Sequence, residues 1–364
     1  MSPIIRSNLY AVSLLLKNVI VFVLPFIIFS FVMNGVSSFK GESWKVILIL
    51  VPLVCVSNFS GFITSYICTS PLLKTGFINI SKLDVKNVLE PAWSINLVPL
   101  VKNDVAMMAG VACGIASSFS KNPAIEKANI ILSKAAGFLL KKVILVILPF
   151  FIVGFIVKMK HEETLSLVIK EYSLLLGVLT VVAYGYMFIL MFFLSSSNLR
   201  TSFARFKNLL PGVLIGLFSM SSAAAIPSTI EASEKNLKNK NIARFVVPAT
   251  ANMHLLGDCF ALPIIGLALM VSFGYKFPTF YEYFIFSLYG VVAKFAAAGI
   301  PGGSAIIFIP IFESVFNFSP TMLTAVTAIY VLFDPIATSS NVFGHGVFAV
   351  LFEKVYTKIF KVKT

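Results

Sequence analysis

The stretch Ser219–Thr229 reads SMSSAAAIPST and lies in an apolar region with no charged residue between Lys207 and Glu231. It combines hydroxyl side chains with small residues and a proline. In hydrocarbon every backbone N–H and C=O needs an internal partner, so such a broken segment survives only where it lines a cavity. A second stretch of this kind, AAAGIPGGSA, follows at Ala296–Ala305. Two interrupted apolar segments in corresponding places indicate a binding site near the membrane midplane.

The composition of the chain indicates that its surroundings are hydrocarbon. Hydrophobic residues make up 58% of the 364 residues, charged residues 12%, and the mean hydropathy is +0.94. A soluble domain of this size would carry about 25% charged residues. We therefore predict an all-α polytopic protein of the cell (inner or cytoplasmic) membrane, in contact with membrane lipid.

Basic residues outnumber acidic ones, for a formal net charge of +14. The Lys and Arg residues lie between apolar segments, which indicates membrane topology rather than a nucleic-acid partner. The basic piece Glu234–Arg244 fits a solvated loop. The four cysteines are scattered without metal-ligand spacing and predict neither a disulfide nor a zinc site.

A spanning helix needs about 20 mostly apolar residues. The sequence predicts about seven spanning helices plus two re-entrant helical hairpins. The less hydrophobic segment Ala92–Ser118 is expected to form short helical pieces, and the run after Asn8 is too long for a signal peptide and fits a first spanning helix. The hairpins are Leu209–Thr229 and Tyr281–Phe312. The other candidate spans are Leu9–Val36, Val46–Cys68, Phe138–Val157, Leu174–Leu194, Phe245–Phe273 and Thr321–Phe352.

The connecting segments divide into two sets if each interrupted segment re-enters from one side. One set carries 18 Lys and Arg residues and the other carries 8. This bias predicts a cytoplasmic C-terminus and an N-terminus outside the cell. The richer set comprises residues 37–45, 118–142, 198–207, 231–244 and 354–364.

Four motifs, taken in order, resemble the dicarboxylate/amino acid:cation symporter family, the glutamate and aspartate transporter homologues. SMSSAAAIP at 219–227 resembles the family's serine-rich tip, and VVPATANMHLLGD at 246–258 resembles its stretch ending in Asn-Met-Asp-Gly. AAGIPGGSAII at 297–307 is similar to the Ala-Gly-Val-Pro-Gly motif, and DPIATSSNVFGH at 334–345 to the final helix. The resemblance extends from about Leu9 to Phe352, and the family's first helix has no counterpart in this chain.

The resemblance implies a homotrimer in which a transport domain moves against a scaffold. Residues 9–208 would be mainly scaffold and trimerisation helices with part of the transport domain, 209–352 the transport core, and 353–364 a basic cytoplasmic tail. It implies that Asp334 holds the amino group of a small amino-acid or carboxylate substrate, and Asn341 and the serine tip its carboxylate. The substrate-binding residues would be Ser219, Ser221, Ser222, Gly299, Pro301, Gly302, Asp334, Thr338 and Asn341.

The residues also support physical arguments of their own. Hydroxyls and free N–H groups at a broken helix suit a carboxylate, although small residues equally let membrane helices pack closely. The three glycines and one proline within Gly299–Gly303 suit a mobile gate. Asp334, Thr338 and Asn341 share one helix face. A buried Asp costs about 3 kcal/mol in a spanning helix, which favours a functional role over a structural hydrogen bond.

One departure from the family concerns the substrate. Members that carry acidic substrates have an Arg three residues after the final-helix Asp, where this chain has Ala337, and no Arg follows Arg244. Bidentate recognition of a side-chain carboxylate needs that fork. A neutral or small amino acid is therefore favoured over glutamate or aspartate.

Other departures concern the coupling ion. Two carboxylates that the resemblance assigns to sodium are His254 and His345 here, and imidazole is a poor ligand for a hard cation. Asn252 and Asn341 remain as a residual sodium site. Because histidine titrates near neutral pH, coupling is predicted to have moved from Na+ to H+ or to have been lost. Asp258, one turn after His254, could stabilise the protonated imidazole or could partner Lys294.

Lys294 lies seven residues before Pro301, near a position where the family holds another sodium ion. Its ammonium group either supplies a permanent positive charge there or extends along a helix toward the membrane interface. The sequence leaves both alternatives open.

The sequence thus predicts a secondary active symporter of amino acids or related carboxylates, coupled to protons or weakly to sodium, with no other cofactor. A sodium- or proton-coupled dicarboxylate or glutamate symporter is one alternative. A non-transporting sensor or assembly protein is another, motivated by the missing helix, Arg and sodium carboxylates and opposed by the retained Asp334 and Asn341. No nucleophile–base or metal-ligand spacing predicts an enzyme.

Overall fold

The computed structural model describes residues 2–37, 44–76, 78, 89–95, 97–98, 100–101, 103–120, 122–162, 165–296 and 302–360. Within these ranges the chain is helical and contains no strand, which agrees with the predicted all-α class. Three of the described helical segments are long and apolar enough to cross a membrane: Leu48–Lys74, Tyr172–Leu194 and Pro320–Phe360. The total number of spans stays a prediction.

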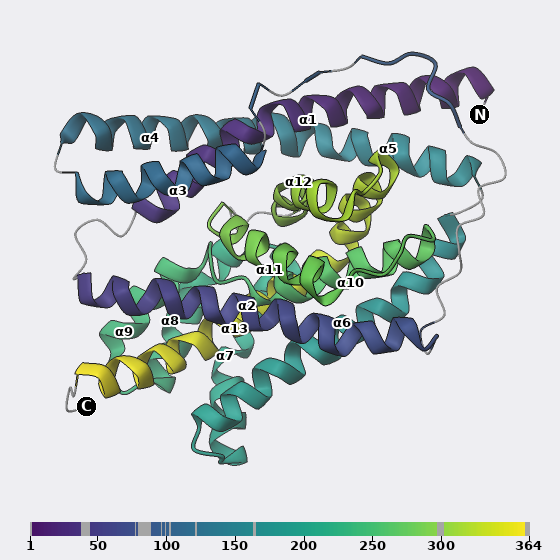
Figure 1. The fold of residues 1–364 in the computed structure, drawn as a ribbon. Coiled ribbons are helices and arrows are strands. Elements are labelled where there is room, and N and C mark those ends of the chain that lie inside the picture. The colour runs from purple at the N-terminus through teal and green to yellow at the C-terminus, as the bar shows by residue number, and fades with distance from the viewer. Residues whose placement is uncertain are drawn as a thin grey trace.

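One group of helices packs around α1 (Pro3–Ser37). Helices α3 (Asn103–Phe119), α4 (Pro123–Phe138) and α5 (Leu145–His161) all contact α1. Helix α4 continues into α5 through the π-helical turn η1 (Leu139–Ile144). This group forms the upper layer in Figure 1.

The segment from 92 to 142 differs from its prediction. In the segment Ala92–Ser118, expected to form short helical pieces, the described residues before 103 are not helical and the remainder belongs to the single helix α3. Much of the expected connecting segment 118–142 is helix α4. The Oδ1 atom of Asn122 accepts a hydrogen bond from the Ala124 N–H at 2.9 Å, and Pro123 occupies the first turn. Asn at the N-cap followed by Pro is a strong helix start, and it overrides the basic character of the segment.

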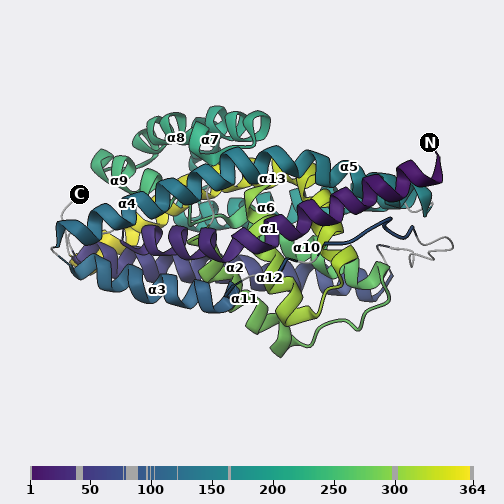
Figure 2. The same cartoon turned by 90° about the horizontal axis from the view of Figure 1, so that it is seen from above.

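The second group of helices surrounds α10 (Leu256–Ser272) and α13 (Pro320–Phe360). Helix α10 is buried on every side from Leu256 to Met270, which is typical of a central helix that is apolar all round. Figures 1 and 2 show α13 running through the middle of this group. The surrounding helices are α2 (Trp44–Lys74), α6 (Leu165–Leu194), α7 (Leu199–Ser219), α8 (Ser222–Asn236), α9 (Lys240–Thr250), α11 (Phe280–Lys294) and α12 (Gly303–Phe316).

The first interrupted segment is a hairpin of helices α7 and α8, which pack on each other. The chain turns at Met220, whose φ of 51° is left-handed. Ser221 then starts α8, with its hydroxyl accepting a hydrogen bond from the Ala224 N–H at 3.4 Å. The break therefore falls at Met220 and Ser221, whereas Pro227 is accommodated inside α8.

The second interrupted segment joins α11 to α12, which also pack on each other. Helix α11 ends at Lys294 and α12 begins at Gly303, preceded by Gly302 with φ 71°. Gly299 and Pro301 lie outside the described residues. Re-entry of the two hairpins into the membrane stays a prediction.

A further break divides the predicted span Phe245–Phe273. Helix α9 ends at Thr250 and α10 begins at Leu256, so residues 251–255 are not helical. Asn252 and His254 lie in this break.

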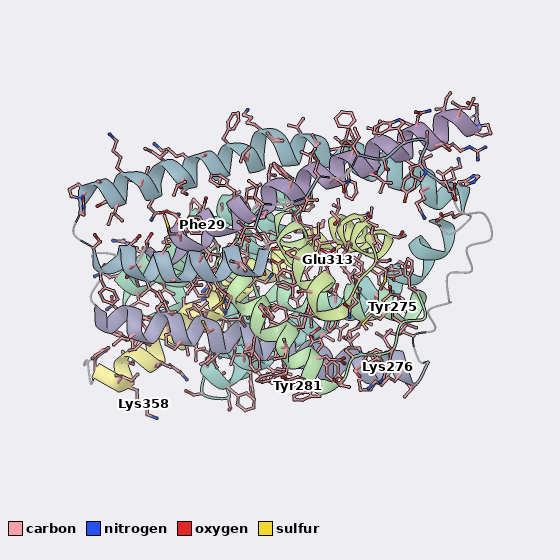
Figure 3. The ribbon with its side chains drawn as sticks, turned by 45° about the horizontal axis from the view of Figure 1, so that its top comes forward. Phe29, Tyr275, Lys276, Tyr281, Glu313 and Lys358 are labelled. Atoms are coloured by element: carbon pink, nitrogen blue, oxygen red, sulfur yellow. The ribbon has the colours of Figure 1, made fainter. Side chains whose placement is uncertain are left out.

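The two chain ends lie far apart. Figures 1 and 2 both place the N-terminus and the C-terminus at opposite ends of the long dimension. In Figure 3, Lys358 near the C-terminus lies on the opposite side of the molecule from Lys276, which lies between α10 and α11. Helices α2 and α6 belong to the 9–208 segment but pack on α10 and α13. The division into scaffold and transport core remains a prediction.

Candidate functional site

Polar side chains gather in the core along one face of α13. Asp334, Thr338 and Asn341 are 3%, 4% and 2% exposed. The Thr338 hydroxyl donates to Asp334 Oδ1 at 2.8 Å. The spacing of four and then three residues brings these groups into line, as expected for a helix.

Asp334 connects α13 to the second hairpin. The Gly302 N–H donates to Asp334 Oδ2 at 2.7 Å, so the carboxylate lies at the N-terminus of α12, where a negative charge is favourable. No basic side chain within the described ranges forms an ion pair with Asp334. Among the described residues, Asp334 is therefore a buried carboxylate whose hydrogen-bond partners are dipolar groups, the Gly302 N–H and the Thr338 hydroxyl.

A second buried carboxylate, Asp258, lies in the first turn of α10. Its Oδ2 atom accepts from Lys294 Nζ at 3.3 Å and from the Ser304 hydroxyl, and its Oδ1 atom accepts from the Tyr330 hydroxyl at 2.7 Å and from Asn341 Nδ2 at 3.1 Å. We call these five residues the Asp258 cluster. Every member is at most 8% exposed.

The Asp258 cluster resolves two alternatives left open by the sequence. Asp258 forms its ion pair with Lys294, and its other hydrogen bonds go to Ser304, Tyr330 and Asn341 rather than to His254. Lys294 is fully buried, with its Nζ atom 4.5 Å from the Phe308 ring centroid, so it does not extend to an interface. A cation over an aromatic face gains further attraction when it is desolvated.

The serine tip is directed toward the same region of α13. A Cβ atom built on Gly212 would lie 3.4 Å from Val342. One built on Gly216 would lie 2.8 Å from Val342 and also 3.3 Å from the Cα atom of Ser339, earlier in α13. Helices α7 and α13 are therefore antiparallel here, and the C-terminal end of α7 is directed toward the turn of α13 that contains Asp334. Close packing in this hairpin thus involves the two glycines, as small residues allow.

The serines themselves differ in burial. Ser219 is exposed, Ser221 is intermediate and Ser222 is buried. The Ser219 hydroxyl donates to the Ile215 carbonyl at 2.6 Å and accepts from the Ser221 N–H at 3.2 Å. The first two hydroxyls are accessible at the tip, whereas the third belongs to the packed face of α8.

Two buried histidines lie near each other. His254 and His345 are 0% and 1% exposed, and their ring centroids are 6.2 Å apart. His254 Nε2 is 2.8 Å from the Ser57 hydroxyl, and its ring lies 4.3 Å from that of Phe348. Within the described chain, His254 Nδ1 and His345 Nε2 have no hydrogen-bond partner. Each imidazole therefore keeps a nitrogen available for exchange of a proton or a hydrogen bond.

The residual sodium site is not assembled. Asn252 is exposed in the break before α10, whereas the Asn341 amide is occupied by Asp258: its Oδ1 atom accepts from the Asp258 N–H at 3.3 Å. The described residues contain no group of three or more His, Cys, Asp or Glu side chains suited to a metal ion. The donor set around the histidines is nitrogen-rich and fits a hard cation poorly.

Sequence reasoning missed several polar residues of the core. Ser57 and Asn58 on α2 hold the break before α10, since Asn58 Nδ2 donates to the Met253 carbonyl at 2.7 Å. Tyr330 lies one turn before Asp334 and binds Asp258 instead. The adjacent polar residues Ser57 and Asn58 inside an apolar span could have indicated this contact, because polar side chains are costly in a membrane span unless they have a partner.

These helices and this buried polar site define an integral membrane transport protein. The chain belongs to the sodium:dicarboxylate symporter family, whose model matches residues 4–355. Membership makes the protein a symporter of the dicarboxylate/amino acid:cation class, which agrees with the resemblance of its motifs. The comparison with curated proteins found no match.

Proposed function

We propose that this symporter carries a small neutral amino acid or a related small carboxylate across the cell membrane, coupled to protons. The proposal rests chiefly on Asp334, a buried carboxylate with no basic partner in the described core. A substrate ammonium group beside Asp334 would offset this charge, and the exposed tip of the first hairpin would meet the substrate carboxylate.

The charge balance of the core disfavours a second substrate carboxylate. Lys294 already pairs with Asp258, and Ala337 is fully buried where acidic-substrate relatives would need an Arg. A glutamate or aspartate side chain would therefore enter without a partner, and an unpaired buried charge is costly.

The histidine pair supports coupling to protons. A proton would be held on the unpartnered nitrogen of either ring, or on His254 Nε2 after rotation of the Ser57 hydroxyl. Asp258, four residues after His254, is already neutralised by its ion pair with Lys294. A proton on the pair would thus supply the charge that relatives obtain from a coupling cation.

The arrangement in the membrane follows the same proposal. The chain ends lie at opposite ends of the molecule, in keeping with a cytoplasmic C-terminus and an external N-terminus. The two hairpins would re-enter the membrane, and three chains would assemble as a trimer.

The direct test is uptake of a labelled amino-acid panel into proteoliposomes, with sodium and pH gradients imposed separately. We expect uptake of a small neutral amino acid that follows the pH gradient. Strong sodium-driven uptake of glutamate or a dicarboxylate would contradict both the substrate and the coupling. Absence of all uptake by intact protein would favour a non-transporting role.

Replacing His254 by Asn should abolish pH-driven net uptake while leaving exchange of labelled for unlabelled substrate. Asn keeps a hydrogen-bonding group for Ser57 but cannot take up a proton. The measurement is net uptake against exchange as a function of external pH. His161→Asn is the matched control, since His161 lies at the end of α5 beside Arg6. An unchanged pH profile in H254N would remove His254 from the mechanism.

A further inference from the structure

The Asp258 cluster ties four helices to one carboxylate. Asp258 belongs to α10, Lys294 is the last residue of α11, Ser304 lies in the first turn of α12, and Tyr330 and Asn341 belong to α13. Lys294 and Ser304 lie before and after residues 297–301 in the chain, and both bind Asp258 Oδ2. Helices α11 and α12 are therefore joined through a single oxygen atom.

The ion pair also satisfies the carboxylate completely. Each oxygen of Asp258 accepts two hydrogen bonds, and the Lys294 ammonium supplies the one full positive charge. An ionised carboxylate in this apolar core would be costly without that charge. Lys294 is fully buried over Phe308, so bulk solvent does not screen the ion pair.

Without the ammonium, the remaining ligands would suit a metal ion. The Asp258 carboxylate and the Ser304 and Tyr330 hydroxyls bound to it are hard oxygen donors. The Asn341 amide oxygen accepts from the Asp258 N–H and would have to turn to join them. Hard monovalent cations prefer such oxygen ligands, and the negative charge of Asp258 would attract one. The Lys294 ammonium lies 3.3 Å from Asp258 Oδ2, beside the charge that would attract such an ion.

We propose that Lys294 is a resident cation that ties α11 and α12 to Asp258 and makes this junction of four helices independent of sodium. This inference extends the proposed coupling to protons. Its consequence for transport rests on that proposed function, whereas the role of Lys294 in joining the helices does not. Helices α11 and α12 stay tied to α10 and α13 whether or not an alkali ion is present. Removal of the ammonium should convert the cluster into a sodium site.

The test is the thermal stability of the full-length protein in detergent, measured in sodium chloride and in choline chloride at equal ionic strength. We expect the wild-type Tm to be the same in both salts. In choline, Lys294→Met should lower the Tm by about 10 °C, because it leaves a buried charge unpaired. In sodium chloride, K294M should regain several degrees.

Two further variants complete the test. Asp258→Asn combined with Lys294→Met removes both charges and should restore most of the Tm with no difference between the salts. Lys276→Met is the matched control, since Lys276 is exposed at the edge of the molecule (Figure 3), and it should change nothing. If K294M alone fails to fold, its recovery by D258N supports the proposal, and failure of D258N to recover it contradicts the proposal.

The outcomes separate this inference from the proposed function. A wild-type Tm that rises specifically with sodium, or a K294M Tm that is equal in both salts, would overturn the resident cation. Absence of uptake by the wild type, with sodium-sensitive stability of K294M, would overturn the transport proposal and leave the resident cation standing.

Discussion

Replacing Gly257 by Ala should prevent α10 from packing on α13 and should lower the Tm more than any other single methyl added to the core. A Cβ atom at Gly257 would lie 2.0 Å from the Ala337 carbonyl oxygen, 2.8 Å from its carbonyl carbon and 2.9 Å from Ser340 Cβ. Because the nearest atoms belong to the backbone, no rotamer change relieves the clash. The two helices must move apart, at an expected cost of about 3 kcal/mol.

The separation should also damage the site. Asp258 follows Gly257 directly and depends on Tyr330 and Asn341 of α13 for two of its hydrogen bonds. We therefore expect G257A to show a Tm lowered by about 10 °C together with loss of substrate binding.

The matched control for this prediction is Gly185→Ala on α6. A Cβ atom at Gly185 would meet nothing within 4 Å, and Ala is favoured over Gly in a helix by about 1 kcal/mol. G185A should therefore be as stable as the wild type or slightly more stable. Equal Tm values for G257A and G185A would show that α10 and α13 do not approach as closely as the structure indicates.

Much of the fold was predictable because membrane spans carry a strong local signal. Apolar runs located α1, α2, α6 and α13, and the serine tip indicated the break between α7 and α8. Helix α4 was missed because its lysines suggested a loop. The Asn122-Pro123 pair is a recognisable helix start, but the prediction gave more weight to the charged residues of the segment than to this capping signal.

The site was predictable where its residues share one helix and not where they meet between helices. Asp334, Thr338 and Asn341 follow from helical periodicity alone. The pairing of Asp258 with Lys294 joins residues 36 positions apart on different helices, so spacing could not choose between Lys294 and His254. The exposure of Asn252 follows from the break at residues 251–255, which no local pattern specified.

Replacing Asp334 by Asn should weaken binding of an amino-acid substrate roughly 100-fold while leaving the fold intact. Asn keeps an amide oxygen that can accept from the Gly302 N–H, and its amide NH2 can donate to the Thr338 hydroxyl after that hydroxyl rotates, so the link to α12 survives. What it loses is the negative charge, and removing one partner of a buried ion pair costs about 3 kcal/mol or more. The measurement is binding of labelled substrate by purified protein, with Tm followed in parallel.

The substrate itself supplies the sharpest control for Asp334. An analogue with a hydroxyl in place of the amino group has no charge for Asp334 to bind, so D334N should weaken its binding far less than that of the amino acid. Glu313→Gln makes the same change on the exposed side of α12 (Figure 3) and should leave both ligands unaffected. Equal losses for the two ligands in D334N would mean that Asp334 acts only by holding Gly302. The contact of residue 334 with the start of α12 is the same in both measurements. A loss confined to the amino acid would therefore show that the Asp334 carboxylate binds the substrate ammonium group.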